Sequence, residues 1–132
     1  MYVFSHRMKI QKKMKKINNL INKKNRSKIV CLTAYSKSIA SILDKHCDLI
    51  LVGDSLGSVV YNYKSTKEVT LKTMINHAKS VRAGVKKSLM VVDMPYNTYR
   101  NSKEALKNAK LVMRETKCDA VKLEGGKKII SI

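Results

Sequence analysis

The stretch LILVGDSLGSVV, residues 49–60, decides how the chain folds, because a short apolar run ends abruptly on an acid. Its first four residues are aliphatic and have the length and composition of a buried β-strand. Gly53, Asp54 and Ser55 then follow, and Gly57 comes two residues after Ser55. This order predicts a strand that ends at a functional loop of an α/β sheet.

Three further apolar runs resemble this one, so that the predicted strands are KIVCLTAY (28–35), CDLILVGD (47–54), SLMVVDMP (88–95) and CDAVKLEG (118–125). Between them, apolar residues recur at three- and four-residue intervals over 36–46, 71–85 and 105–113, which is the helical period. Asn101, three residues before Glu104, gives the last helix a capping signal. Alternating strands and helices predict right-handed βαβ units and a parallel sheet buried on both faces.

The 132-residue chain is long enough for one domain with a single core. We divide it into a basic leader, residues 1–27, and a folded region, residues 28–132. In the leader, Ile10, Met14, Ile17 and Ile21 have helical spacing, which predicts either a helix that packs on the fold or an amphipathic membrane-surface or targeting segment. Apolar runs fall far short of the roughly 20 residues of a membrane span. We therefore expect a soluble, cytoplasmic protein without a membrane partner.

The net charge of +19 raises the class of nucleic-acid-binding proteins. Ten of the 28 basic residues lie in residues 1–28, lysine outnumbers arginine, and tryptophan is absent. Since arginine and aromatic side chains supply most base recognition, a solvated lysine surface fits better than a specific nucleic-acid site. The three cysteines form no CxxC pair and lie in apolar runs, which indicates small buried residues in a reducing compartment.

Acids end three consecutive predicted strands, namely Asp54, Asp93 and Glu124. The carboxyl ends of parallel strands meet at one edge, where α/β enzymes place their chemistry. Lys122 lies two residues before Glu124 and so shares its face of the strand. Two interpretations follow: an internal ion pair between Lys122 and an acid of a neighbouring strand, or carboxylates that hold Mg²⁺ with Lys122 beside an anionic substrate.

Ser55 is the best candidate for a neutral hydrogen-bond donor at this edge. It has no GxSxG context and no evident base, so it is not predicted to be a nucleophile. Its hydroxyl and main-chain N–H are placed to hold a substrate carboxylate. Gly53 and Gly57 would let the main chain approach a ligand closely.

Five motifs carry a resemblance to a known family: TAYS (33–36), LVGDSLG (51–57), EVTL (68–71), DMPY (93–96) and VKLEGG (121–126). In order and spacing they resemble the ketopantoate hydroxymethyltransferases of pantothenate biosynthesis, from about Lys28 to Gly126. The resemblance implies a (β/α)₈ TIM barrel, of which this chain holds about the first four βα units after an N-terminal helix. It also implies an enzyme that assembles as a homo-oligomer, a decamer in the family.

The family transfers a one-carbon unit from 5,10-methylenetetrahydrofolate to 3-methyl-2-oxobutanoate and forms 2-dehydropantoate, with Mg²⁺ as cofactor. Carried over to this chain, the resemblance implies that Asp54 and Asp93 bind the metal, and through it the substrate. Glu124 would join the metal shell directly or through water. Ser55 and Lys122 would hold the oxo acid.

Two features depart from the family pattern. Ser36 stands where the family's TAYD motif has an acid, and no residue of this chain matches the family's proton-abstracting glutamate. A (β/α)₈ barrel needs about 250 residues, so we expect the chain to be incomplete and inactive alone. The alternatives are a magnesium-dependent lyase or mutase of the phosphoenolpyruvate mutase and isocitrate lyase group, a basic nucleic-acid-binding module, or a non-functional fragment.

Overall fold

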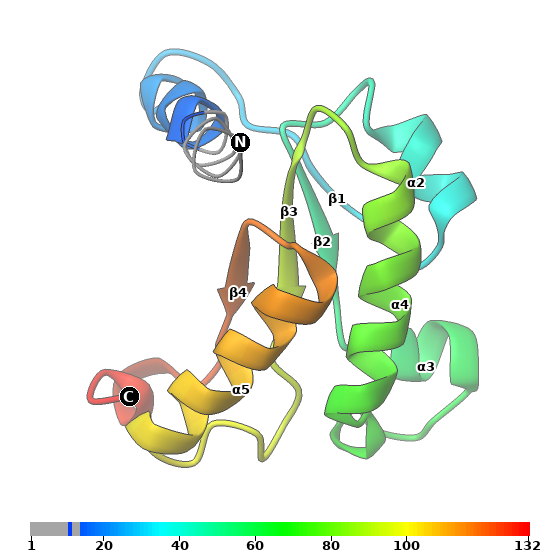
Figure 1. The fold of residues 1–132 in the computed structure, drawn as a ribbon, viewed down its shortest axis with the longest axis vertical. Helices are drawn as coiled ribbons and strands as arrows, with labels where there is room; N and C mark the ends of the chain where they lie inside the picture. The colour runs from blue at the N-terminus through cyan, green and yellow to red at the C-terminus, as the bar shows by residue number, and fades with distance from the viewer. Residues whose placement is uncertain (1–10, 12–13) are drawn as a thin grey trace, which may run out of the picture.

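The computed structural model describes residue 11 and residues 14–132, which form a four-stranded parallel sheet with helices along it (Figure 1). The strands are β1 (Cys31–Thr33), β2 (Leu49–Val52), β3 (Leu89–Asp93) and β4 (Ala120–Lys122). They lie in the sheet in the order β1-β2-β3-β4, each pair parallel. All four predicted strands are confirmed, although each is shorter than its apolar run. Strand order that follows chain order is the winding of a barrel, whereas a doubly wound sheet reverses direction at a switch point.

The three predicted helices are confirmed as α2 (Lys37–Leu43), α4 (Leu71–Gly84) and α5 (Ser102–Thr116). The Asn101 side chain caps α5 by accepting a hydrogen bond from the Glu104 N–H at 2.9 Å, as its spacing predicts. Three short elements were not predicted: α3 (Leu56–Tyr61), a 3₁₀ turn (Thr66–Glu68) and a second 3₁₀ turn (Gly126–Ile129). The first two follow β2 and lie at its carboxyl end (Figure 1).

The hydrophobic core lies between the sheet and these helices. Ile50 and Val52 of β2 are fully buried there, and Met90 and Val92 of β3 are their register partners. Met74, Val81 and Val112 supply the helical side of the core. Because side chains alternate along a strand, Leu49 and Leu51 point to the opposite face, where they are only half-buried.

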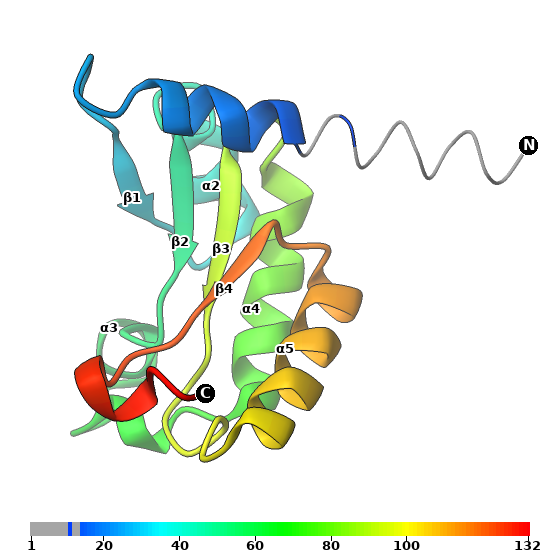
Figure 2. The same ribbon diagram turned by 90° about the vertical axis from the view of Figure 1, so that its left-hand side faces the viewer.

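The opposite face of the sheet is open within the described residues (Figure 2). Every residue of β1 is exposed, including Cys31, and Leu32 keeps 42% of its surface. The prediction of a sheet buried on both faces is therefore wrong. The prediction of buried cysteines is confirmed for Cys118 but wrong for Cys31, while Cys47 is half-buried. The physical reason is that α2, α4 and α5 all lie on one side, as they do outside a barrel, so that the inner face of a partly wound barrel has no cover of its own.

A helix over residues 14–22 lies across the amino-terminal ends of the strands (Figure 2). Lys16 Nζ donates to the Ser88 carbonyl at 3.0 Å, and Lys23 forms a 2.5 Å ion pair with Asp48. Met14 and Ile21 of the predicted apolar stripe remain exposed, and Ile10 lies outside the described residues. Ile17 of the same stripe is half-buried, so the helix packs through part of its apolar stripe and through these polar contacts. No helix in the described part of the chain is long and apolar enough to cross a membrane.

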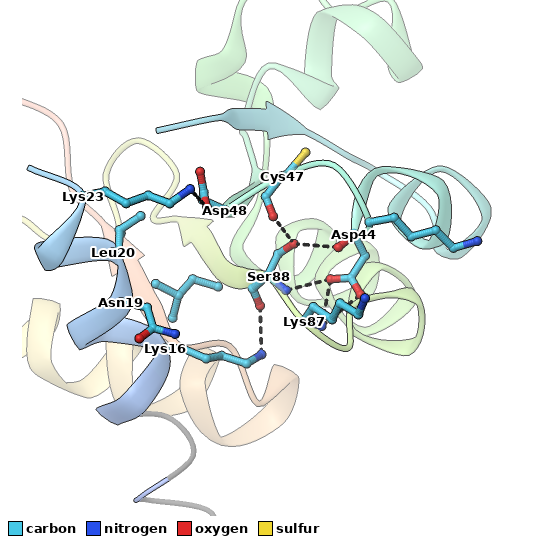
Figure 3. Close-up of a pocket in the computed structure, with 11 residues that line it drawn as sticks. Lys16, Asn19, Leu20, Lys23, Asp44, Cys47, Asp48, Lys87 and Ser88 are labelled. Atoms are coloured by element: carbon cyan, nitrogen blue, oxygen red, sulfur yellow. Dashed lines mark hydrogen bonds and ion pairs between the residues drawn. The ribbon is translucent and has the colours of Figure 1, made fainter. Parts of the chain in front are cut away.

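A cavity of about 230 Å³ separates this helix from the loops before β2 and β3 (Figure 3). On one side of it the carboxylate of Asp44, 6% exposed, accepts hydrogen bonds from the main-chain N–H groups of Lys86, Lys87 and Ser88. Burial alone would raise the pKa of Asp44, but these hydrogen bonds outweigh it and lower the pKa below its ordinary value. Asp44 therefore ties the end of α2 to the segment that leads into β3.

Candidate active site

The predicted site residues lie together at the carboxyl-terminal edge of the sheet, opposite the 14–22 helix. Asp54 and Ser55 follow β2 directly, Asp93 is the last residue of β3, and Lys122 is the last residue of β4. Asp93 and Lys122 are register partners, so their side chains project from the same face. That face is the open one, because Val91, two residues before Asp93, is the register partner of half-buried Leu51.

Asp93 is the most deeply buried of these groups, with 3% of its surface exposed. Its Oδ2 accepts a hydrogen bond from the Asp54 N–H at 3.3 Å. Its Oδ1 lies 3.0 Å from Lys122 Nζ, yet this buried oxygen has no hydrogen bond of acceptable geometry among the described residues. Burial raises the pKa of Asp93 although Lys122 opposes the shift. Asp93 thus presents a buried carboxylate oxygen that is paired by charge but not by hydrogen bonding.

Lys122 bridges two carboxylates, since its Nζ also lies 2.7 Å from Glu124 Oε1. Burial lowers the pKa of Lys122, but the ion pairs with Glu124 and Asp93 outweigh it and the net shift is upward. The ion pair between Lys122 and an acid of the neighbouring strand, the first of the two interpretations, is therefore present. The ammonium has three N–H donors and contacts two carboxylates, so one N–H can donate to a further oxygen.

The predicted metal ligands do not converge as a set of three. Among the described residues, no three His, Cys, Asp and Glu side chains form a group that could hold a metal ion. Glu124 is turned to Lys122, and its side chain is 63% exposed. Burial raises the pKa of both Asp54 and Asp93; the charge of Glu124 adds to the shift at Asp54, and the charge of Asp54 adds to the shift at Asp93. A cation bound among these carboxylates would relieve this repulsion.

Gly53 leaves room for Ser55 and Asp93 to lie close together, while the close approach of its main chain to a ligand stays a prediction. A Cβ at Gly53 would lie 2.8 Å from Ser55 Oγ and 3.5 Å from Asp93 Oδ2. Gly57 has a different role from the one expected, since a Cβ there would lie 2.6 Å from the Val69 side chain rather than at the site. Its small size is needed for packing of α3.

Two tyrosines at this edge were not predicted as site residues. The Tyr35 hydroxyl lies 2.8 Å from Ser55 Oγ, and the Tyr99 hydroxyl donates to the Glu124 carbonyl at 3.0 Å and accepts from the Glu124 N–H at 3.3 Å. Tyr35 belongs to the TAYS motif, so the motif was a signal for it. Tyr99 had no such signal, because its contact joins the loop after β3 to the end of β4, 25 residues away.

A parallel sheet wound in chain order, with helices on one face and charged side chains at its carboxyl edge, defines part of a (β/α)-barrel enzyme. The chain belongs to the ketopantoate hydroxymethyltransferase family, whose family model matches residues 13–132. This is a TIM-barrel family, in agreement with the fold. Because the chain belongs to this family, the alternative of the phosphoenolpyruvate mutase and isocitrate lyase group is wrong.

Three relatives, each named 3-methyl-2-oxobutanoate hydroxymethyltransferase, show the extent of the similarity. The protein from Pelagibacter ubique is 74% identical over 118 residues, which cover 89% of this chain and 46% of the relative. The proteins from Rhizobium etli and Anaplasma marginale are each 57% identical, over 76% and 79% of this chain and over 37% and 38% of their own lengths. The chain thus spans less than half the length of these relatives.

Proposed function

We propose that this chain supplies the oxo-acid-binding part of a 3-methyl-2-oxobutanoate hydroxymethyltransferase of pantothenate biosynthesis. The reaction moves a one-carbon unit from 5,10-methylenetetrahydrofolate to 3-methyl-2-oxobutanoate and gives 2-dehydropantoate. The observation that carries the proposal is the convergence of Asp54, Ser55, Asp93 and Lys122 at one sheet edge, with a buried Asp93 oxygen that lacks a hydrogen bond among the described residues.

The donor set fits Mg²⁺, a hard cation that proteins bind through one or two carboxylates while its other positions are left to water and substrate oxygens. Asp54 and Asp93 would hold it, and Glu124 would reach it through water. When bound, the cation would withdraw charge from the keto group of the oxo acid.

The chain's own residues would bind the oxo acid and stabilise charge. Ser55, directly after β2, would donate a hydrogen bond to the substrate carboxylate. Lys122 would direct its remaining N–H to the keto oxygen, where negative charge develops when C3 loses its proton. The ion pairs with Asp93 and Glu124 fix the ammonium for this role and keep it charged, since they raise its pKa.

Further parts of the proposal concern the whole enzyme. No residue of the chain is matched to the family's proton-abstracting glutamate, so we propose that the 132-residue chain binds the oxo acid without catalysing proton removal. The complete enzyme would be a cytoplasmic homo-oligomer, and the folate would approach the open edge of the sheet. Accordingly, deuterium exchange at C3 of 3-methyl-2-oxobutanoate should stay at the uncatalysed rate with this chain.

Calorimetric titration of the chain with 3-methyl-2-oxobutanoate, with and without Mg²⁺, tests the binding role. We expect Mg²⁺ to increase the affinity, Asp93→Asn to abolish the increase, and Glu115→Gln to leave it unchanged. Glu115 is the matched control because it is an acid on α5 that pairs with Lys79, away from the site. Equal affinity with and without Mg²⁺, or an Asp93→Asn variant that behaves like the wild type, would refute the proposal.

A further inference from the structure

A series of hydrogen bonds links Ser55 to three residues, from the loop after β1, from α4 and from α3. It begins at the 2.8 Å contact between Ser55 Oγ and the Tyr35 hydroxyl. His77 of α4 then contacts the Tyr35 carbonyl through Nδ1 at 2.8 Å and the Tyr61 hydroxyl through Nε2 at 2.9 Å. Tyr61 is the last residue of α3, a helix that starts directly after Ser55.

The partners of His77 select between its two neutral tautomers. A carbonyl oxygen only accepts hydrogen bonds, so Nδ1 must carry the hydrogen that is donated to Tyr35. Nε2 then faces the Tyr61 hydroxyl, which can donate to its lone pair. Of the two neutral tautomers, the Nδ1–H form is therefore the one that makes both bonds.

His77 of α4 holds the main chain of Tyr35 by a hydrogen bond, and Tyr61 of α3 holds His77 from the other side of its ring. His77 lies in the middle of α4, and the Tyr61 ring packs edge-on against it with centroids 5.6 Å apart. The Tyr61 ring also stacks on Tyr63 at 5.3 Å. The Tyr35 hydroxyl is thereby presented to Ser55 from a position that packing and hydrogen bonding both determine.

The direction of the Tyr35–Ser55 bond follows from the chemistry of the substrate. A carboxylate only accepts hydrogen bonds, so a Ser55 hydroxyl that binds a carboxylate must donate its single hydrogen to it. Ser55 Oγ can then take part in the bond to Tyr35 only as the acceptor, and Tyr35 must donate. A hydroxyl that accepts one hydrogen bond while it donates another is oriented and polarised by the first.

We propose that Tyr35 is a positioning residue for oxo-acid binding, which directs the Ser55 hydroxyl hydrogen toward the substrate, and that His77 holds Tyr35 in place. This inference rests on the proposed function, in which Ser55 contacts the oxo acid. Neither residue contacts the substrate in this account, and neither takes part in holding the metal.

The test compares Tyr35→Phe, His77→Leu and His77→Asn with the wild-type chain in titrations of 3-methyl-2-oxobutanoate with Mg²⁺ present. Loss of one hydrogen bond predicts an affinity about five- to tenfold lower for Tyr35→Phe. His77→Leu should weaken binding similarly. His77→Asn should recover most of the affinity, because the asparagine amide can replace the Nδ1–H donor. Mg²⁺ affinity should stay unchanged in all three variants. General damage to the fold would instead lower the affinity for both Mg²⁺ and the oxo acid.

A second measurement, long-range ¹H–¹⁵N NMR of the imidazole rings in the ligand-free chain, should show a hydrogen on Nδ1 of His77. A ring that carries its hydrogen on Nε2 alone, or equal oxo-acid affinity in Tyr35→Phe and wild type, would overturn this inference alone. Failure of the wild-type chain to bind the oxo acid would overturn the proposed function and the inference with it.

Discussion

Replacement of Asp44 by alanine should destabilise the fold more than any surface substitution. The carboxylate accepts hydrogen bonds at 2.8 to 3.0 Å from three consecutive main-chain N–H groups, of Lys86, Lys87 and Ser88. These bonds join the end of α2 to the start of β3, two elements that are far apart in sequence. The variant would leave all three donors without this acceptor.

The magnitude follows from the burial of the donors. Ser88 is 3% exposed, so its N–H would lose a charge-assisted bond without replacement by bulk water, at about 1.5–3 kcal/mol. The N–H groups of Lys86 and Lys87 belong to exposed residues that water can reach, and we assign about 0.5–1 kcal/mol to each. The expected loss is about 2.5–5 kcal/mol, a large fraction of the roughly 5–15 kcal/mol that stabilises a typical domain.

Urea unfolding followed by circular dichroism measures this loss, with Glu115→Ala as the control for an exposed acid. The sign of the pH dependence is a second check. Because hydrogen bonding lowers the pKa of Asp44 in the fold, its contribution is present above the ordinary aspartate pKa and is lost as pH falls through the folded-state pKa. The variant should therefore show a flatter acid limb than the wild type. A loss below about 1 kcal/mol, or an unchanged acid limb, would refute the reasoning.

Three further substitutions test particular contacts. Gly84→Ala should destabilise the chain by about 1–3 kcal/mol in urea unfolding, because its Cβ would lie 2.9 Å from the Ala40 side chain between α4 and α2; wild-type stability would show that these helices separate easily. Ser36→Asp should add about 0.5–1 kcal/mol, since Ser36 is the N-cap of α2 and its side chain makes no capping bond in the described structure; an unchanged melting temperature counts against this. Tyr99→Phe should speed hydrogen exchange at the Glu124 amide, which donates to the Tyr99 hydroxyl; exchange at the wild-type rate would show that the contact does not form in solution.

The strands and long helices could be predicted because their signals are local. Short runs of Val, Ile and Leu between helical patterns identify strands, and the Asn101–Glu104 spacing identified the start of α5. The ends of the apolar runs placed Asp54, Asp93 and Glu124 at one edge, and the alternation of side chains placed Lys122 beside Glu124, which it contacts. The positions of the site residues in the fold therefore followed from the sequence alone.

The remaining features depend on contacts that local patterns do not contain. An apolar strand has the same sequence pattern whether one or both faces of its sheet are covered, so the exposure of Leu32 was not predictable. The Lys122–Glu124 bond competes with a metal site for the same acid, and spacing cannot rank the two. Tyr35 reaches Ser55 across 20 residues of sequence, through a loop whose path depends on His77.

In the proposed function, Asp54 and Asp93 would form a divalent-cation site that binds the oxo acid. Titration of the ¹⁵N-labelled chain with Mn²⁺ in the presence of 3-methyl-2-oxobutanoate tests it, because Mn²⁺ accepts carboxylate ligands and broadens nearby amide resonances. The account predicts that resonances of Gly53, Asp54 and Asp93 broaden first, that excess Mg²⁺ restores them, and that those of Asp44 and Asp48 at the opposite end of the sheet stay sharp. Broadening centred on Asp44 and Asp48, or unchanged broadening in an Asp54→Asn, Asp93→Asn double variant, would contradict it.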